Sequence, residues 1–367
     1  MLKGNNIYKD LRFISLLLAK GERKEASYLG YVGYGNLGDE ALKEAVFELF
    51  KDTIIFSESR GFLIRHLEQI GLLRFKLLFL GGGTLILRSE KVLKDISDKS
   101  IPQKIIFGTG VANHIFWKDV PGKYGDMKEW MNTLNNVDFL SVRGPISKQI
   151  LMDKGINKSV HVIGDPVLYF IRDIKSPKPK LKNLGVNIGA TGGGQTKDLM
   201  WGRNDDHFFS KFIDFIRTMS GDGWQIEFVP VNKNDEILTD NLLIKNGLQK
   251  NIKVFRDYTS TQKTIDHMEG FDVFVGQKLH ATVLSYCANT PAVMVEYRPK
   301  CRDFMASIDM ERFNVRTDEF NVAIGKKLVE EMYRDLELIR VKTNKICLDY
   351  KIKLIEAALK VGKFINQ

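Results

Sequence analysis

The sequence predicts an α/β protein made of two doubly wound lobes that face each other across a cleft. Short β-rich apolar runs alternate with amphipathic stretches, which is typical of parallel α/β structure. The alternation stops once, at residues 174–183, where two prolines and four lysines stand in a segment almost without apolar side chains, and then it restarts. The 367 residues also exceed the length of one ordinary domain.

The first lobe is expected over residues 1–173. Its amphipathic stretches at 39–50 and 145–154 are predicted helices, and Leu42, Val46 and Leu49 recur at helical spacing in the first of them. The predicted strands are Tyr28–Val32, Thr53–Phe56, Lys76–Leu80, Lys104–Phe107, Asp138–Val142 and Val160–Ile163.

The linker 174–183 leads to a second lobe over 184–320. Residues 321–367 form C-terminal helices, in which the apolar stripes Leu328–Ile339 and Ile352–Leu359 are both interpreted as packing faces. The predicted strands of the second lobe are 184–188, 225–229, 252–255, 272–275 and 292–295, and its predicted helices are 206–219, 261–268, 279–288 and 302–308.

Composition narrows the class of protein. With 44% apolar and 27% charged residues, each half can bury a core, so disorder is not expected. The net charge of +10 suits an anionic ligand or an anionic membrane surface, although it also serves solubility. A nucleic-acid partner is not expected, because the basic residues are spread along the chain without interleaved aromatic side chains.

The cysteines and the absence of an 18-residue apolar run indicate a cytoplasmic protein. Cys287, Cys301 and Cys347 form no Cys-x-x-Cys pair, so neither a disulfide framework nor a structural metal site is expected. The first 30 residues are rich in lysine and arginine, which is compatible with peripheral contact at the inner membrane face.

Glycine-rich segments follow three strands of the first lobe. They are Gly33-Tyr34-Gly35-Asn36-Leu37-Gly38-Asp39-Glu40, Gly81-Gly82-Gly83-Thr84 and Gly108-Thr109-Gly110. The carboxyl ends of parallel strands share one edge of a sheet, so all three are expected to border the cleft. We expect Gly82 and Gly83 to let a ligand or the opposite lobe approach the backbone, which makes them candidate acceptor-binding residues.

The first of these segments predicts a site for a hydroxyl-rich ligand. Free N–H groups at a helix start favour an anion, but Asp39 and Glu40 in the first turn already offset the helix dipole. Carboxylates bind sugar hydroxyls by accepting hydrogen bonds, which makes Asn36, Asp39 and Glu40 candidate acceptor-binding residues. A helix cap provided by Asp39 explains the same residues and stays open as an alternative.

Two further positions end the first lobe. Arg143, in Ser141-Val142-Arg143, stands where a strand ends and can present a planar fork to a carboxylate or phosphate; pairing with a neighbouring acid is the alternative. Asp165, in Gly164-Asp165-Pro166, is interpreted as a turn residue rather than a cleft carboxylate.

In the second lobe, His280 is the strongest candidate for proton transfer. It follows Gly276-Gln277-Lys278-Leu279 at a predicted helix start, where the helix terminus and Lys278 should lower its pKa and keep the imidazole neutral. The glycine-rich stretch 187–195, with Gly192 and Gly193, is a candidate donor loop. After the last predicted strand, Arg298, Lys300 and Arg302 cluster where an anionic donor would lie.

Together these segments resemble the polysaccharide pyruvyltransferase family. The ordered set is Gly35-Asn36-x-Gly38-Asp39-Glu40, Gly81-Gly82-Gly83, Ser141-Val142-Arg143, Gly164-Asp165-Pro166, Leu279-His280-Ala281 and Tyr297-x-x-Lys300, and it spans roughly residues 27–308. The resemblance implies two Rossmann-like lobes of the glycosyltransferase-B type. It further implies transfer of the pyruvyl group of phosphoenolpyruvate to two hydroxyls of one hexose, giving a cyclic ketal and phosphate.

The resemblance implies roles for the candidate residues. His280 and Asp39 would carry proton transfer, and Arg143, Lys278, Arg298 and Lys300 would bind the anionic donor without a metal or cofactor. Where the family often has arginine, this chain has Lys278, which keeps the charge but not the bidentate fork. The sequence fixes neither the oligomeric state nor whether the acceptor is lipid-linked, nucleotide-linked or polymeric.

Two rival functions remain. A sugar-nucleotide glycosyltransferase would share the architecture and often needs a ribose-binding carboxylate late in the second lobe, for which Glu296 is the nearest candidate. A non-catalytic binding module would tolerate loss of His280.

Overall fold

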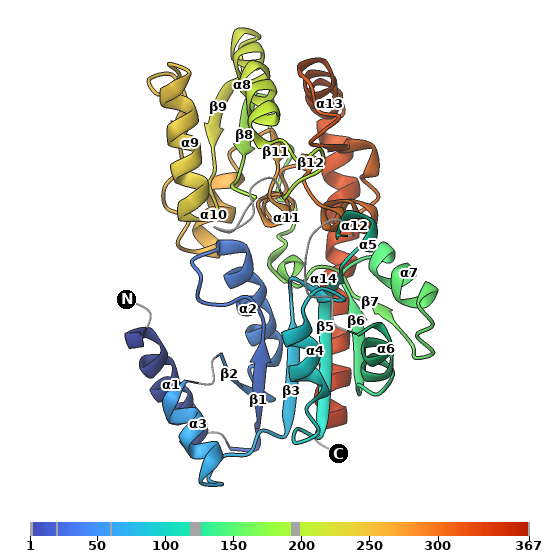
Figure 1. Cartoon of the computed structure of the whole chain (residues 1–367). Helices are drawn as coiled ribbons and strands as arrows, with labels where there is room; N and C mark the ends of the chain where they lie inside the picture. Colours follow the sequence, from blue (N-terminus) through green and yellow to red (C-terminus); the bar gives the residue numbers. More distant parts are fainter. Residues whose placement is uncertain (1–2, 20, 59–60, 118–125, 192–198, 366–367) are drawn as a thin grey trace.

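The computed structural model consists of two α/β lobes stacked end to end, with the chain passing between them twice (Figure 1). It describes residues 3–19, 21–58, 61–117, 126–191 and 199–365. Within these residues the strands form two sheets, and the recorded strand pairs are parallel.

The N-terminal sheet has the order β2-β1-β3-β5-β6-β7, with β4 beside β5. Its strands are β1 (Lys24–Leu29), β2 (Ile54–Ser57), β3 (Leu77–Gly81), β4 (Thr84–Ile86), β5 (Gln103–Val111), β6 (Phe139–Val142) and β7 (His161–Val162). The helices of this lobe are α1 (Lys3–Leu18), α2 (Leu37–Phe50), α3 (Phe62–Gln69), α4 (Glu90–Ser97), α5 (His114–Trp117), α6 (Met127–Asn135), α7 (Pro145–Asp153) and the 3₁₀ helix η1 (Pro166–Phe170).

The C-terminal sheet has the order β10-β9-β8-β11-β12-β13. Its strands are β8 (Asn183–Asn187), β9 (Gln225–Phe228), β10 (Lys253–Val254), β11 (Val273–Gly276), β12 (Ala292–Glu296) and β13 (Asn314–Arg316). The remaining helices are α8 (Asp205–Gly221), α9 (Lys233–Lys245), α10 (Thr261–Met268), α11 (Leu279–Cys287), α12 (Pro299–Ser307), η2 (Glu311–Phe313), α13 (Val322–Arg334) and α14 (Leu336–Ile365).

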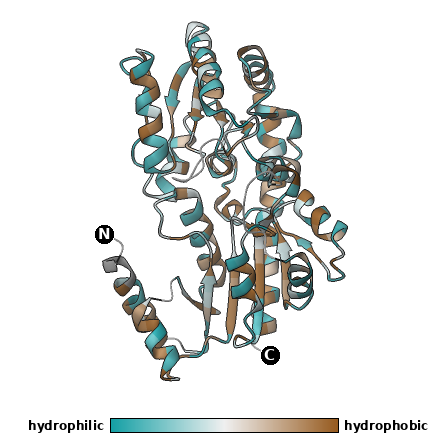
Figure 2. Cartoon of the chain, in the orientation of Figure 1, coloured by the Kyte–Doolittle hydropathy of each residue, from teal (hydrophilic) through white to brown (hydrophobic). Residues whose placement is uncertain are grey.

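The apolar strands form the centre of each lobe. Strands β3 and β11 are buried along their whole length, as expected when helices cover both faces of a parallel sheet. In Figure 2 the strands of the lower sheet are mostly brown, whereas the helices carry both colours. One hydrophobic cluster runs through both lobes, from Phe79 and Phe107 to Val186 and Phe274.

Helix α14 joins the lobes a second time. It starts next to α13, which packs on α8, and then runs back along η1 and α2 of the N-terminal lobe (Figure 1). Its buried side chains include Ile339, Cys347, Leu354 and Val361. The predicted packing role of Ile352, Ile355 and Leu359 is wrong, because these side chains are exposed.

Two further expectations about local structure are wrong. The first strand spans Lys24–Leu29 rather than Tyr28–Val32, so the glycine segment begins four residues after it, at Gly33. Gly108-Thr109-Gly110 is not a loop but part of β5. There Gly108 has φ of +62°, and the register to β6 shifts between Ile106 and Thr109, as in a bulge.

Candidate active site at the junction of the lobes

The start of α2 brings the acidic pair of the N-terminal lobe to the lobe junction. Asn36, not Asp39, caps the helix, since its Oδ1 accepts from the Gly38 N–H at 3.1 Å. The amide of Asn36 also donates to Asp39 Oδ2 at 2.7 Å. The alternative in which Asp39 caps the helix is therefore wrong, and Asp39 lies in the first turn with its carboxylate held by Asn36.

Glu40 points into its own lobe. Its Oε1 accepts from the Gly33 N–H at 2.6 Å, and its Oε2 accepts from Lys43 at 2.8 Å. Burial would raise the pKa of Glu40, but these hydrogen bonds outweigh it and the pKa is lowered. In this arrangement Glu40 fixes the glycine segment, and both of its carboxylate oxygens are engaged.

The three successive glycines after β3 serve packing and backbone conformation. A Cβ on Gly82 would come within 2.7 Å of Leu42 Cδ1, and Gly82 and Gly83 have positive φ angles of 60° and 74°. Leu42 belongs to α2 of the same lobe, so the approach at Gly82 is neither to a ligand nor to the opposite lobe. The Gly83 carbonyl accepts from Arg143 Nη2 at 3.1 Å.

Five side chains from both lobes meet at the junction; we call them the junction cluster: Asp39, Arg143, Asp165, His280 and Lys300. Arg143 and Asp165 are fully buried and form an ion pair, with 2.8 Å between Nε and Oδ2. The same oxygen lies 3.8 Å from His280 Nε2. Asp165 is thus both the cap of η1, through the Val167 N–H, and a buried carboxylate, a role that the prediction of a turn residue missed.

His280 stands between the two lobes. It is the second residue of α11 and packs on Gly38, where a Cβ would be only 2.3 Å from His280 Nδ1. Its pKa is lowered well below the usual value by burial first, and then by the charges of Arg143 and Lys300. The predicted neutral imidazole is therefore present, but its cause is burial and the junction cations rather than Lys278.

Asp39 and Lys300 have pKa values shifted toward each other. Burial raises the pKa of Asp39 to about 6, against the opposing charges of Lys300 and Arg143. Burial, together with the charges of Arg298 and Arg143, lowers the pKa of Lys300 to about 7. Paired shifts of this kind are characteristic of groups that exchange protons or bind charged ligands.

The predicted donor cations gather around one aromatic ring. Lys278 Nζ, Arg298 Cζ and Lys300 Nζ lie 5.8, 5.0 and 5.2 Å from the centroid of the buried Tyr297 ring. Cations at such distances are attracted by the face of the ring. The sequence identified Tyr297 only as part of a motif and did not indicate that its ring would be surrounded by cations.

The four cations differ in how their charge is compensated. Arg143 pairs with Asp165, and Lys278 lies 3.5 Å from Asp235 and donates to the Ala190 carbonyl. Arg298 instead donates to the carbonyl oxygens of Thr191 and Leu199. In the described part of the chain neither Arg298 nor Lys300 forms an ion pair, so these two carry the positive charge that a bound anion would meet.

Asp303 joins the lobes from α12. Its Oδ1 accepts from the N–H groups of Ile146 and Ser147 at 2.9 and 3.1 Å, and its Oδ2 accepts from the Ser147 hydroxyl at 2.6 Å. The cap of α7 therefore comes from the opposite lobe. Nothing in the local sequence distinguishes Asp303 from a surface aspartate.

Some candidates lie elsewhere or outside the described residues. Arg302 pairs with Glu296 at 3.0 Å, away from the junction cluster. Gly192 and Gly193 fall outside the described residues. Over the residues that are described, no group of three or more histidine, cysteine, aspartate or glutamate side chains could hold a metal ion. The same residues contain no helix that is both long and apolar enough for a membrane crossing.

The fold and the junction cluster define a two-lobed α/β protein of the glycosyltransferase-B type, with acidic, basic and imidazole groups between its lobes. The chain belongs to the polysaccharide pyruvyl transferase family, whose model matches residues 36–299. The match covers the first turn of α2, the junction histidine and the start of α12, and it identifies a transferase that acts in polysaccharide synthesis. A comparison with curated protein sequences finds no match.

Solved structures share the architecture at low sequence identity. A glycosyltransferase from Rickettsia africae has a TM-score of 0.56 and 12% identity, over 94% of this chain and 98% of that one. A UDP-glucosyltransferase from Polygonum tinctorium has a TM-score of 0.55 and 11% identity, over 93% and 98%. The HepE protein of Anabaena, solved with UDP and glucose, has a TM-score of 0.54 and 10% identity, over 92% and 99%. These similarities establish the fold alone.

Proposed function

We propose that this protein transfers the pyruvyl group of phosphoenolpyruvate to two hydroxyls of a hexose in a cell-surface polysaccharide or its precursor. The products are a cyclic pyruvate ketal and phosphate. The observation that carries the proposal is the junction cluster, in which a neutral imidazole and a cation without an ion-pair partner from one lobe meet a carboxylate of the other, in a chain of this family.

The reaction has a simple proton balance. The first hydroxyl oxygen bonds to the enol carbon of the donor, and one proton is added at the methylene carbon, which becomes the methyl group. The bond from the former enol carbon to the bridging phosphate oxygen then breaks. The second hydroxyl oxygen bonds to that carbon in its place, and the proton of this hydroxyl leaves with the phosphate. Two hydroxyl protons are thus removed and two are delivered, which requires groups that change protonation near neutral pH.

His280 and Asp39 are the proposed proton-transfer groups. A neutral imidazole accepts a hydroxyl proton, and a carboxylate with a pKa of about 6 can bind or deprotonate an acceptor hydroxyl. The acceptor is proposed to lie on the N-terminal side, near Asn36 and Asp39. Of the other predicted acceptor contacts, Glu40, Gly82 and Gly83 have neighbours within their own lobe.

The donor is proposed to bind through Lys300 and Arg298. Phosphoenolpyruvate carries a carboxylate and a phosphate, and charge-assisted hydrogen bonds to such groups are stronger than neutral ones. Arg143 and Lys278 already have carboxylate partners, so we assign them a weaker, more distant electrostatic contribution. The proposal needs phosphoenolpyruvate as co-substrate and no further cofactor.

A direct assay tests the proposal. The protein is incubated with phosphoenolpyruvate and a panel of hexosides, inorganic phosphate is followed, and mass spectrometry looks for the pyruvyl ketal. His280→Ala should nearly abolish product while the variant keeps the thermal transition of the wild type. Full activity of that variant would remove His280 from the mechanism, and a binding module would show no product in any reaction.

A sugar-nucleotide glycosyltransferase is the alternative that the fold allows. Its ribose-binding carboxylate would have to be Glu296, yet that side chain is buried and accepts from Trp201, Arg302 and Asn314. Because its oxygens are occupied, we favour the pyruvyl donor. A thermal-shift comparison decides between them: stabilisation by UDP-sugars but not by phosphoenolpyruvate would reverse this preference.

We also propose that α1 and α3 form a surface that contacts an anionic membrane. The outer face of α1 exposes Ile7, Leu11 and Leu18 in one line, and α3, which packs against α1, exposes Phe62. In Figure 2 this arm of the molecule carries both colours. Beside it, a cavity of about 200 Å³ is lined by apolar side chains and by basic ones such as Arg12.

Charge favours a lipid surface as the occupant of this face. Arg12, Arg65 and Arg74 are exposed around the apolar side chains, and basic residues near an anionic surface contribute about 1 kcal/mol each. Apolar side chains flanked by arginine are typical of helices that lie in a membrane interface. Such contact would bring the junction cluster close to lipid-linked acceptors.

Vesicle co-sedimentation tests this contact. The protein should bind vesicles containing anionic phospholipid, release at high salt, and bind neutral phosphatidylcholine vesicles poorly. Leu11→Glu with Leu18→Glu should abolish binding, whereas Leu338→Glu with Val341→Glu, two exposed positions of α14, should not. Equal loss in both pairs, or self-association that depends on Leu11 and Leu18 without vesicle binding, would contradict the membrane assignment.

A further inference from the structure

Among the described residues, two buried polar atoms without a recorded hydrogen bond lie near each other at the junction, and one of them also has the ion-pair contact to Arg143. They are Asp165 Oδ2 and His280 Nε2, which are 3.8 Å apart. Buried polar atoms in folded proteins nearly always have a partner. A closer approach of about 1 Å would turn the pair into a hydrogen bond of ordinary length.

Asp165 is the fixed member of this pair. Its Oδ1 accepts from the Val167 N–H at 3.0 Å, which orients the carboxylate at the start of η1. Its Oδ2 lies 2.8 Å from Arg143 Nε, which favours the ionised form, against the effect of burial, which raises the pKa of Asp165. A carboxylate held in this way can only accept a hydrogen bond from the imidazole.

The other ring nitrogen of His280, Nδ1, faces a different part of the N-terminal lobe. Nδ1 lies against Gly38 in the first turn of α2, so close that any side chain at Gly38 would collide with it. Asp39, the proposed acceptor-side carboxylate, is the next residue. The ring is therefore placed with one edge toward Asp165 and the other toward the proposed acceptor position.

We infer that Asp165 is a positioning residue that accepts a hydrogen bond from the Nε2–H of His280 and so leaves the electron pair of the neutral ring on Nδ1. Catalytic hydrogen bonds are often long in ligand-free structures and shorten when the substrate binds. In this arrangement Nδ1 takes the proton of the second acceptor hydroxyl as its oxygen bonds to the former enol carbon and the bond from that carbon to the phosphate oxygen breaks. The carboxylate of Asp165 offsets the charge of the imidazolium, and the proton leaves with the phosphate released from the donor.

The chemical step rests on the proposed function, but the ring tautomer does not, and it can be measured without substrate. In protein with ¹⁵N-labelled histidine, the two ring nitrogens give distinct signals for each tautomer, and His280→Gln identifies the signals of His280. We expect the Nε2–H form in the wild type. The Nδ1–H form in the wild type would overturn the inference, whatever any variant does.

Asp165→Asn tests the cause of the tautomer. The amide oxygen should keep the hydrogen bond from the Val167 N–H, which places the amide NH₂ where Oδ2 stood, facing His280 Nε2. A donor at that position should switch the ring to the Nδ1–H form. Asp235→Asn changes a different buried carboxylate, which belongs to the C-terminal lobe, and should leave the signals of His280 unchanged. An unchanged tautomer in Asp165→Asn would overturn the assignment.

Kinetics provides a second readout. A ring held in the wrong tautomer should lower kcat by roughly 10²–10⁴-fold, while the KM for phosphoenolpyruvate changes little because Lys300 and Arg298 are untouched. Asp165→Asn combined with Arg143→Gln removes the uncompensated arginine if the single variant does not fold. If the wild type proves unable to transfer pyruvate, the proposed function fails while the tautomer result still decides the role of Asp165.

Discussion

Gly38 determines how closely the two lobes can approach at His280. A Cβ at this position would stand 2.3 Å from both Cβ and Nδ1 of His280, well inside any real contact. The glycine is required here by space and not by a positive φ, since its backbone is the ordinary first turn of α2. The sequence marks Gly38 only as part of a glycine-rich motif. It does not show that Gly38 contacts His280, which is 242 positions away along the chain.

Gly38→Ala should therefore impair activity more than stability. Overpacking costs about 1–3 kcal/mol, which a protein of this size tolerates, but the displaced imidazole would lose its place beside Asp165. We expect a fall in kcat of tenfold or more with a modest decrease in the urea midpoint. Gly221→Ala, where nothing lies within 4 Å of the new Cβ, is the matched control. Equal activity of the two variants would mean that His280 does not depend on Gly38.

The lowered pKa of Lys300 predicts that capture of the proposed donor, phosphoenolpyruvate, depends on pH. Burial and the charges of Arg298 and Arg143 lower its pKa to about 7 in the free protein, so above pH 7 the ammonium loses its proton and its attraction for the donor. The value of kcat/KM for phosphoenolpyruvate should then fall up to tenfold per pH unit. Lys300→Arg keeps its charge at every accessible pH and should remove this falling limb. A limb that persists in Lys300→Arg would belong to another group.

A loss of activity above pH 7 would not be caused by a loss of folding stability through deprotonation of Lys300. Between about pH 7 and the ordinary lysine pKa of 10.5, the unfolded chain binds the Lys300 proton and the folded protein does not. Stability contributed by this group therefore rises with pH over that window. Asp39, with a pKa raised to about 6, changes the pH dependence of stability only below that value. Thermal unfolding measured across the same pH range separates the two effects.

At the scale of elements, helix α7 depends on a cap from the opposite lobe. Its own N-cap residue is Gly144, which has no side chain, and Pro145 follows at the first helical position. The free N–H groups of Ile146 and Ser147 donate to Asp303 of α12. A Cβ on Gly144 would collide with Asp303, so the glycine and the aspartate form one contact.

Asp303→Ala should lower the free energy of unfolding by about 1–3 kcal/mol, the range for a lost cap with charge-assisted hydrogen bonds. Asp303→Asn is the conservative control, because its amide oxygen can still accept from both N–H groups. Urea denaturation of the two variants and the wild type gives the comparison. A loss in Asp303→Asn as large as that in Asp303→Ala would point to the charge, not the cap.

A strand or helix could be predicted from the sequence where its own residues mark where it begins and ends. Helix α10 begins and ends as predicted, and β9 differs by one residue, because apolar periodicity and flanking polar residues mark both. The prediction that Gly108–Gly110 follow the strand is wrong. Glycine normally interrupts a strand, whereas here the strand β5 continues through these glycines with a bulge. The predicted packing face at Ile352, Ile355 and Leu359 of α14 is wrong because periodicity shows that a helix face is apolar but not what covers it.

The candidate site, too, could be predicted only as far as single residues and their own elements, and not in its contacts. Its residue types could be found, since His280, Asp39, Arg143 and Lys300 each follow a strand or begin a helix. Their pairings could not, because Arg143 meets Asp165 and Lys278 meets Asp235 only after the lobes have folded. The sequence therefore could not show that Arg143 and Lys278 have carboxylate partners whereas Lys300 and Arg298, among the described residues, have none, and the donor-binding role of all four stays a prediction.

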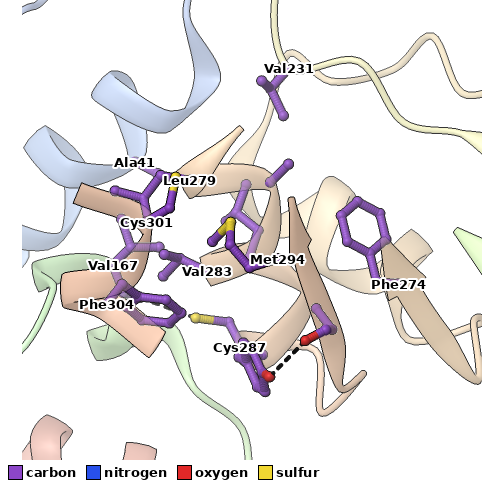
Figure 3. Packing of buried hydrophobic residues seen from close by; sticks show 14 of the residues in the cluster. Ala41, Val167, Val231, Phe274, Leu279, Val283, Cys287, Met294, Cys301 and Phe304 are labelled. Atoms are coloured by element: carbon purple, nitrogen blue, oxygen red, sulfur yellow. Dashed lines mark hydrogen bonds between the residues drawn. The ribbon is translucent and has the colours of Figure 1, made fainter. Parts of the chain in front are cut away.

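The whole molecule behaves as one packed body rather than two separate lobes. Figure 3 shows Ala41 of α2 and Val167 of η1 among Leu279, Val283 and Phe304 of the C-terminal lobe. Main-chain and side-chain hydrogen bonds cross the same junction, from the Leu37 N–H to the Val231 carbonyl at 2.9 Å and from Thr261 to Glu44 at 2.5 Å. Helix α14 also connects the lobes, because it runs from the C-terminal lobe back along the N-terminal lobe. The site groups therefore lie in or beside a core that both lobes share, and both lobes determine their positions.

This continuity predicts a single cooperative unfolding transition. Val142→Ala in β6 and Val186→Ala in β8 remove the same methyl groups from the two lobes, at positions that are fully buried. Each should cost roughly 2 kcal/mol and shift one calorimetric peak of the whole chain downward by about 2–3 °C. Two resolved peaks, of which Val142→Ala moves one and Val186→Ala the other, would show that the lobes unfold independently. In that case the junction could open without loss of either core, and the geometry of His280, Asp165 and Gly38 would have to be re-established each time the lobes closed on a substrate.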